Sequence, residues 1–198
     1  MDPVPAQIRR VISRLEDRDR IDRADGTPRS RRLRAVTHDV GEFLLTLALA
    51  TRAQDILEIG TSGGYSTLWL ALAARRNDGL VTTFENDPEK VAIARATFAE
   101  AGVEDVVHLR AEDARAGLGT LEAPADLVFL DSEKEQYLPL LPQLVALLRE
   151  GGVLVADNLI SHADDLSAFR EAALGHPSLL GSVVPVGRGE LVAVKLLS

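Results

Sequence analysis

Apolar residues recur along the chain with two kinds of spacing, and each spacing predicts a different element. Residues 5–23 show helical spacing, which predicts an amphipathic helix with one apolar face: Ile8, Val11, Ile12 and Leu15. The polar stretch 25–34 contains glycine and proline and indicates a linker. A second helix is expected over residues 39–52.

From residue 55 onward, short apolar runs alternate with helical patterns. Five of these runs are typical of buried strands: 55–60, 80–85, 105–110, 126–131 and 152–157. Such alternation is typical of a mainly parallel sheet with helices on both faces. Two further runs, 179–186 and 190–197, are joined by only three residues and must form an antiparallel hairpin. We therefore expect an α/β, doubly wound, seven-stranded sheet with one reversed strand.

Composition narrows the classes of protein that fit. The 198 residues are 46% hydrophobic and 26% charged, which suits one globular domain. The absence of cysteine excludes a disulfide framework, a cysteine nucleophile and a thiolate metal site. No apolar run approaches the ~18 residues of a membrane span, and the N-terminus lacks the apolar core of a secretory signal. We expect a cytoplasmic protein that binds no membrane.

The net charge of −8 is unevenly distributed. Residues 1–34 hold ten arginines against six acids, whereas the other 164 residues hold 12 basic and 24 acidic side chains. An acidic body argues against nucleic acid as a partner. The signs alternate within the N-terminal segment, which favours an ion-paired helix face over an RNA-binding arm.

A glycine-bearing turn follows the first predicted strand, in residues 60–66. Such a turn lets the backbone approach a ligand at the start of a helix. Ser62 and Tyr65 occupy positions where a dinucleotide fingerprint needs glycine, and no P-loop lysine follows. Glu85 ends the second predicted strand, where a carboxylate can accept both hydroxyl hydrogens of a ribose. Asp87, next to a proline, is better explained as a helix cap.

Four segments carry a resemblance to a known family: ILEIGTSGGYSTLWLA, FENDPEKVAIAR, DLVFLDSEKEQY and GGVLVADN. From about residue 35 to 197, the chain resembles class I S-adenosylmethionine-dependent methyltransferases. The specific similarity is to the metal-dependent catechol and caffeoyl-coenzyme A O-methyltransferases. The resemblance implies the strand order 3-2-1-4-5-7-6 and a methyltransferase domain over 35–198, preceded by the helix and basic linker of 1–34.

The resemblance also implies how S-adenosylmethionine is bound. The loop around Gly60 would hold the methionine part, Glu85 the ribose, and Asp113 would lie near the adenine; Val36 would touch the cofactor as well. The full set expected to bind the cofactor is Val36, Glu58, Gly60, Thr61, Ser62, Tyr65, Ser66, Glu85, Asn86, Asp113, Ala114 and Asp131.

Oxygen donors gather where the fourth and fifth predicted strands end. Asp131 ends the fourth strand, and Asp157 and Asn158 end the fifth. Neighbouring strand tips lie ~4.8 Å apart at the ligand-binding edge, so these three side chains suit a divalent cation, Mg²⁺ above all. The resemblance places the family's metal ligands at the same three positions.

Lys134 follows Asp131 by three residues, in the first turn of the next predicted helix. A helix N-terminus and a nearby metal both favour loss of its proton, which would make it a usable base. The resemblance implies that Lys134 is the catalytic base. Tyr137 either covers the site or fills the core. Ser161 fits a capping box, which makes His162 a first-turn residue that is not a metal ligand, with a substrate contact left open.

These observations predict methyl transfer to a hydroxyl oxygen of a small, catechol-like acceptor. Two alternatives stay open: methylation of hydroxylated uridine in tRNA, and a non-catalytic cofactor-binding protein. Relatives of this type are often homodimers, so a second subunit is favoured over the chain's own core as the partner of the N-terminal helix. The linker that follows the helix is expected to act as a lid.

Overall fold

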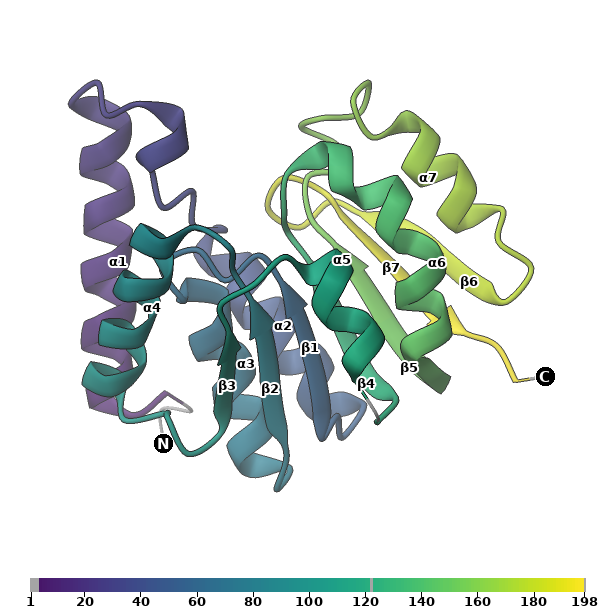
Figure 1. Ribbon diagram of the computed structural model, residues 1–198, viewed down its shortest axis with the longest axis horizontal. Coiled ribbons are helices and arrows are strands. Elements are labelled where there is room, and N and C mark those ends of the chain that lie inside the picture. Colours follow the sequence, from purple (N-terminus) through teal and green to yellow (C-terminus); the bar gives the residue numbers. More distant parts are fainter. Residues whose placement is uncertain (1–3, 122, 198) are drawn as a thin grey trace.

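Residues 4–121 and 123–197 are described by a computed structural model (Figure 1). Within them one sheet has the order β3-β2-β1-β4-β5-β7-β6, and β7 runs antiparallel to both of its neighbours. The expected fold class, strand order and reversed strand are confirmed. The strands are β1 Asp55–Ile59, β2 Leu80–Phe84, β3 Val107–Arg110, β4 Ala125–Leu130, β5 Leu148–Ala156, β6 Leu179–Val184 and β7 Glu190–Lys195.

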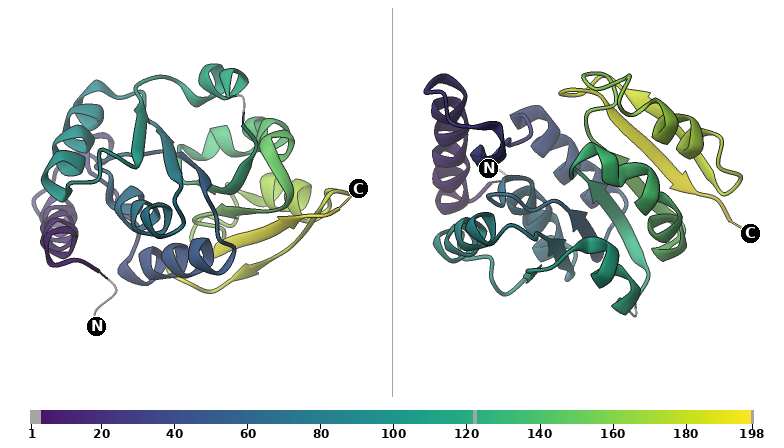
Figure 2. Two further views of the ribbon diagram at one scale, coloured as in Figure 1. Left: turned by 90° about the horizontal axis from the view of Figure 1, so that it is seen from below. Right: turned by 45° about the horizontal axis from the view of Figure 1, so that its top comes forward.

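Helices cover both faces of the sheet (Figure 2). One core contains α1 Ala6–Ala24, α2 His38–Ala50, α3 Tyr65–Arg76 and α4 Pro88–Ala101. The other contains α5 Ala114–Gly117, α6 Tyr137–Leu147 and α7 Ser167–Leu174. Short 3₁₀ helices lie at Arg29–Arg31 (η1), Leu118–Thr120 (η2) and Lys134–Gln136 (η3). Successive strand residues point to opposite faces, so Ile56 packs in the first core and Leu57 in the second.

Backbone pairing continues one residue beyond several strands at the carboxyl edge of the sheet. The Asp131 N–H donates to the Ile59 carbonyl at 2.9 Å, and the Asp157 N–H donates to the Leu130 carbonyl at 3.1 Å. These bonds hold the residues that follow β4 and β5 side by side. The sheet itself therefore sets the spacing of the two carboxylates.

The apolar face of α1 is buried within the chain. Its four apolar residues are each at most 2% exposed and pack in the same core as α3 and α4: Ile8, Val11, Ile12 and Leu15. The expectation that a second subunit covers this face is wrong, because α3 and α4 already do so. The alternating charges of the helix form ion pairs along it, Arg18 with Asp22 and Arg23 with Asp19.

Helix α7 begins at Ser167, so the capping box expected at Ser161 is not formed. The Ile160 and Ser161 N–H groups donate to the Arg188 carbonyl, at 3.1 and 3.0 Å. These bonds hold residues 160 and 161 against the turn between β6 and β7, and the helix begins only at Ser167. No helix of the described residues is long and apolar enough to cross a membrane.

The packing of α1 is tested by two matched substitutions on the same helix. Ile12 is 2% exposed, whereas Ile21 is 50% exposed. Ile12→Val should lower the free energy of unfolding by about 1 kcal/mol, because it deletes a buried methyl group. Ile21→Val should change it by less than about 0.5 kcal/mol. Urea denaturation measures both, and equal small losses would show that α1 is not docked.

Candidate functional site

A cavity of about 280 Å³ lies at the carboxyl edge of the sheet. It brings together residues from both halves of the fold. Most of the residues predicted for the cofactor, the metal and the base line it: Val36, Gly60, Thr61, Ser62, Tyr65, Ser66, Glu85, Asn86, Ala114, Asp131, Lys134, Asp157 and Asn158. Glu58 and Asp113 are not in its lining.

The turn after β1 approaches the neighbouring strands closely. Gly60 has a φ of +103°, and a Cβ at this position would collide with the carbonyl oxygen of Asp131. Glycine is therefore required for both its conformation and its small size. The N–H groups of Gly60 and Thr61 both donate to the Phe84 carbonyl at 3.1 Å. These contacts fix the turn beneath the cavity, at the start of α3.

Glu85 joins the turn after β2 to the turn after β1. Its Oε2 accepts from the Ser62 N–H at 2.9 Å, and its Oε1 accepts from the Asn86 and Asp87 N–H groups at 3.0 Å each. A carboxylate oxygen has further acceptor capacity, so these bonds leave room for hydroxyl donors. Asp87 caps α4 as expected, accepting from the Glu89 and Lys90 N–H groups at 2.8 and 3.3 Å.

Glu58 lies behind the cavity wall with a fully buried side chain. Its carboxylate accepts hydroxyl hydrogens from Ser66 and Thr83 at 2.6 Å and from Thr67 at 2.5 Å. Burial raises its pKa to about 7. Glu58 thus holds the first turn of α3 through the hydroxyl groups of Ser66 and Thr67. Its direct contact with a cofactor stays a prediction.

Asp113 caps α5 and forms an ion pair with Arg115 at 2.9 Å. Its neighbours on either side, Glu112 and Ala114, line the cavity, but its own carboxylate does not. The expected role of Asp113 near the adenine stays a prediction.

The raised pKa of Glu58 predicts a pH-dependent stability. The folded chain keeps this proton up to about pH 7, whereas an unfolded glutamate loses it near 4.5. The contribution is therefore fully present below about pH 4.5 and is lost as pH rises through 7, on the order of 3 kcal/mol. Urea denaturation measures the free energy of unfolding at pH 5 and at pH 8. The decrease between these two pH values should be smaller for Glu58→Gln than for the wild type. Glu104→Gln, at an exposed acid, should behave like the wild type, and so would Glu58→Gln if the assignment were incorrect.

The three predicted metal ligands lie together. The Asn158 amide nitrogen donates to Asp157 Oδ2 at 2.6 Å and to Asp131 Oδ1 at 3.2 Å. The Asn158 N–H donates to Asp157 Oδ1 at 2.6 Å, and Asn158 has a φ of +74°. Among the described residues, no three His, Cys, Asp or Glu side chains are grouped to hold a metal ion. The predicted set contains two acids and is completed by an amide.

Negative charge is concentrated at this edge. Burial and the neighbouring Asp157 raise the pKa of Asp131, while Lys134 opposes the shift. Asp131 keeps 19% of its side chain exposed, so the solvent that reaches it comes through the cavity. Glu190, at the start of β7, is fully buried, and no donor in the described part of the chain faces its carboxyl oxygens. Burial and Asp157 raise the pKa of Glu190, and the protonated form can donate to Asp157.

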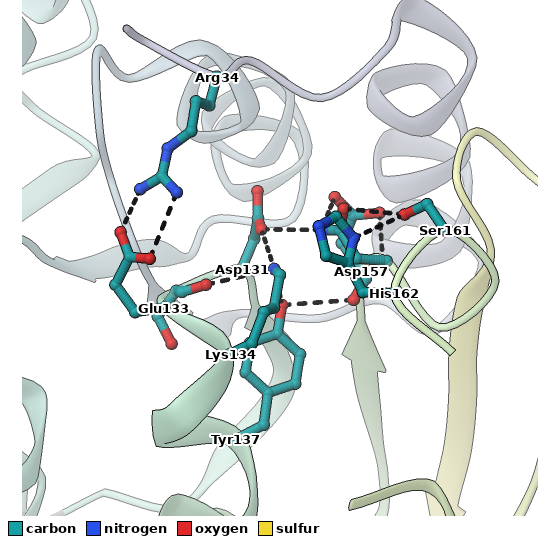
Figure 3. Close-up of polar contacts among 10 residues, drawn as sticks. Arg34, Asp131, Glu133, Lys134, Tyr137, Asp157, Ser161 and His162 are labelled. Atoms are coloured by element: carbon teal, nitrogen blue, oxygen red, sulfur yellow. Dashed lines mark hydrogen bonds and ion pairs between the residues drawn. The ribbon is translucent and has the colours of Figure 1, made fainter. Parts of the chain in front are cut away.

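Lys134 is held between Asp131 and Tyr137 (Figure 3). Its Nζ donates to Asp131 Oδ1 at 3.3 Å, to the Ser132 carbonyl at 3.2 Å and to Tyr137 Oη at 2.8 Å. Lys134 begins η3 rather than an α-helix, since α6 starts at Tyr137. Tyr137 belongs both to the core and to the site. Its side chain is 0% exposed, and its hydroxyl donates to the Asp157 carbonyl at 3.3 Å.

Sequence reasoning missed several residues of the cavity wall. Leu33 and Arg34 line it from the N-terminal side. The Leu33 carbonyl accepts from Ser62 Oγ at 2.5 Å, and Arg34, with a φ of +52°, forms an ion pair with Glu133 (Figure 3). The only signal in the sequence was the basic linker just before Val36. Its expected role as a lid stays a prediction.

Comparison with known proteins identifies the family. A model of the O-methyltransferase family matches residues 27–168. A catechol O-methyltransferase of Mycobacterium tuberculosis (strain ATCC 25618 / H37Rv) is 42% identical over 167 residues, which cover 78% of this chain and 76% of that protein.

Two crystal structures of similar proteins contain SAH or SAM. The O-methyltransferase of Bacillus cereus in complex with SAH has a TM-score of 0.78 at 28% identity, covering 92% of this chain and 90% of that chain. The O-methyltransferase TomG of Streptomyces achromogenes, involved in tomaymycin synthesis and solved with SAM, has a TM-score of 0.80 at 30% identity and covers 92% and 89%. The family model spans more than half of the chain, and the chain therefore belongs to the S-adenosylmethionine-dependent O-methyltransferases.

Proposed function

We propose that the chain transfers a methyl group to one of two adjacent hydroxyl oxygens on a small, catechol-like acceptor. A divalent cation, best fitted by Mg²⁺, and Lys134 would activate the hydroxyl. One observation carries this proposal: Asp131, Asp157 and Asn158 meet beside Lys134, in the same cavity as the loop after β1. The 42% identical relative, named a catechol O-methyltransferase, supports the acceptor class.

The donor set fits a hard divalent cation. Two carboxylates and an amide converge, and oxygen ligands of this kind suit Mg²⁺ with positions left for other ligands. The amide of Asn158 now offers its nitrogen to both acids, and half a turn about its last side-chain bond would present its oxygen instead. A bound cation would supply positive charge that favours the ionised form of a nearby hydroxyl.

Lys134 is placed to take the hydroxyl proton. Its side chain is 15% exposed, so water has little access to it. Tyr137 and the Ser132 carbonyl hold Nζ beside Asp131, at the edge of the donor set. General base catalysis needs this kind of positioned group, within hydrogen-bond reach of the acceptor hydroxyl. Transfer of the hydroxyl proton to the neutral amine form of Lys134 would leave the acceptor oxygen negative. That oxygen would then attack the methyl carbon, and the cofactor's sulfur would depart as a neutral thioether.

The remaining task of the chain is alignment. The turn at Gly60 and the Glu85 carboxylate hold the cofactor side, and Asp131 and Asp157 hold the acceptor side. Both come from the tips of adjacent strands in one rigid sheet. Holding two reactants in line removes much of the entropic cost of a bimolecular reaction.

The charge pairing along α1 bears on the tRNA alternative. Three arginines of α1, Arg18, Arg20 and Arg23, pair with acids of the same helix, which favours a small acceptor over tRNA. A homodimer, expected from the resemblance, is measured by light scattering.

Methyl transfer to catechol is the test of the proposal. The purified chain with S-adenosylmethionine, Mg²⁺ and catechol should yield mono-methylated product, and EDTA should abolish it. Methylation of hydroxylated tRNA but not of catechol would favour the first alternative. Cofactor binding without product from either acceptor would favour the second.

Glu85 is tested by cofactor affinity. Glu85→Ala should weaken binding by about 1.5–3 kcal/mol, because a hydrogen-bonded charged group is lost. Glu85→Gln keeps an acceptor for the Ser62 N–H and should lose less. Glu89→Ala, at an exposed residue of α4, is the matched control and should bind normally. Calorimetry with S-adenosylhomocysteine measures all three, and an unchanged dissociation constant for Glu85→Ala would remove Glu85 from the site.

A further inference from the structure

Two arginines at the acceptor end of the cavity have no carboxylate partner. Arg29, on η1, and Arg188, in the turn between β6 and β7, both line the cavity. No ion pair joins either of them to any acid in the described ranges 4–121 and 123–197. Arg34, by contrast, is engaged by Glu133. The two free guanidinium groups therefore need another explanation.

Arg188 is fixed beside the predicted metal ligands. Its carbonyl accepts from the Ile160 and Ser161 N–H groups, and the Gly189 carbonyl accepts from the Leu159 N–H at 2.8 Å. These bonds fasten the β6–β7 turn to the segment directly after Asn158. Arg188 is half-buried there, so part of its side chain has left bulk water.

His162 lines the same cavity as Arg29, Arg188 and Lys134. Its half-buried ring lines the same cavity as Asp157 and bonds to Ser161 through Nδ1 at 2.9 Å (Figure 3). Burial, together with the charges of Lys134, Arg29 and Arg188, lowers the pKa of His162, although Asp165 acts in the opposite direction. Three basic side chains from distant parts of the chain thus line one cavity together with His162.

The nearby acids do not neutralise this end. Asp131 and Asp157 face Lys134 and Asn158, and Glu133 faces Arg34. Glu135 and Asp165 are exposed at the outer rim. A half-buried, unpaired guanidinium is suited to a carboxylate, which it can bind through two parallel hydrogen bonds.

We propose that the acceptor carries a carboxylate in addition to its two hydroxyls, and that Arg188 and Arg29 bind this group. The inference rests on the proposed function, because the hydroxyls must lie at Asp131 and Asp157 for the carboxylate to reach the arginines. His162 lines the same cavity and contributes its second ring nitrogen. The substrate class is thus an acidic catechol rather than a neutral or cationic one.

Three catechols of similar size test the charge preference: 3,4-dihydroxybenzoate, the neutral 3,4-dihydroxybenzamide and the cationic 3,4-dihydroxybenzylamine. Their affinities are measured by calorimetry on the full chain loaded with Mg²⁺ and S-adenosylhomocysteine. The benzoate should bind about tenfold more tightly than the amide, the effect expected for one charged hydrogen-bonded pair. Arg188→Gln should remove most of this preference and leave amide binding unchanged, with a smaller effect for the exposed Arg29→Gln. Arg95→Gln, an exposed arginine of α4, is the control of equal charge.

Two results would overturn the inference. One is equal affinity for the three catechols, and the other is a preference for the benzoate that survives in the Arg188→Gln, Arg29→Gln double variant. Arg188→Gln could also weaken the binding of S-adenosylhomocysteine while the preference for the benzoate persists. This outcome would also overturn the inference, and it would assign Arg188 to the carboxylate of the cofactor. Turnover of the same catechols is scored separately. A charge preference in binding without methylation of any of them would refute the proposed function and leave the anion site standing.

Discussion

Asp157→Ala is expected to abolish cation-dependent methyl transfer while leaving cofactor binding within a few-fold of the wild type. Asp157 supplies one of two carboxylates in the proposed donor set, and both of its oxygens already hold Asn158. The charge stabilisation that a bound cation gives is worth several kcal/mol, so activity should fall by ~10³-fold or more. The residues predicted to bind the cofactor follow β1 and β2 for the most part, away from this substitution.

Three measurements separate the metal from the fold in this experiment. Calorimetric titration with Mg²⁺ should show the loss of the cation site, and affinity for S-adenosylhomocysteine should show an intact cofactor side. Asp157→Asn preserves the shape of the side chain and should also lose the cation, which would exclude a purely structural explanation. Full activity of the wild type in EDTA would contradict the metal mechanism outright.

Lys134→Met is expected to lower kcat by about 10²–10⁴-fold, the usual contribution of a positioned general base. Methionine keeps the length and the apolar stem of the side chain but cannot accept a proton. The dissociation constants for Mg²⁺ and S-adenosylhomocysteine should stay near the wild-type values, because Lys134 donates to Asp131 but belongs to neither proposed ligand set.

The Lys134→Arg variant distinguishes a role of Lys134 as a general base from a role as a positive charge alone. Arginine keeps the positive charge beside Asp131 but does not give up its proton in proteins. We expect it to be as inactive as Lys134→Met. In both variants the residual rate should rise with pH over the whole accessible range, because activity would then follow hydroxide or the acceptor's own ionisation. Wild-type kcat in Lys134→Arg would show that Lys134 acts only as a cation.

Much of the site followed from local patterns in the sequence. Asp131, Asp157 and Asn158 could be placed because each directly follows an apolar run, and parallel strands present their carboxyl ends at one edge. Gly60 and Glu85 could be placed for the same reason. In these cases a short pattern and one topological rule were sufficient.

Other residues depend on contacts that no local pattern encodes. Glu190 begins a strand-like run, and its burial follows from the insertion of β7 between β5 and β6. Arg34 meets Glu133 from 99 positions away and needs a left-handed backbone to do so. Ser161 looked like a helix cap, yet the carbonyl of Arg188 engages its backbone instead. The sequence indicates which side chains can act, and long-range pairing decides which of them do.

The strand order divides the work of the protein between two blocks of the chain. The turns after β1 and β2 belong to one half of the sheet, while the ends of β4 and β5 and the β6–β7 turn belong to the other. Asp131 stands at the boundary, since β4 pairs with both β1 and β5. Under the proposed function, the choice of acceptor depends on residues 158–166 and 187–189. Exchanging those two short segments between relatives would diversify the molecules that are methylated while the cofactor half is inherited unchanged.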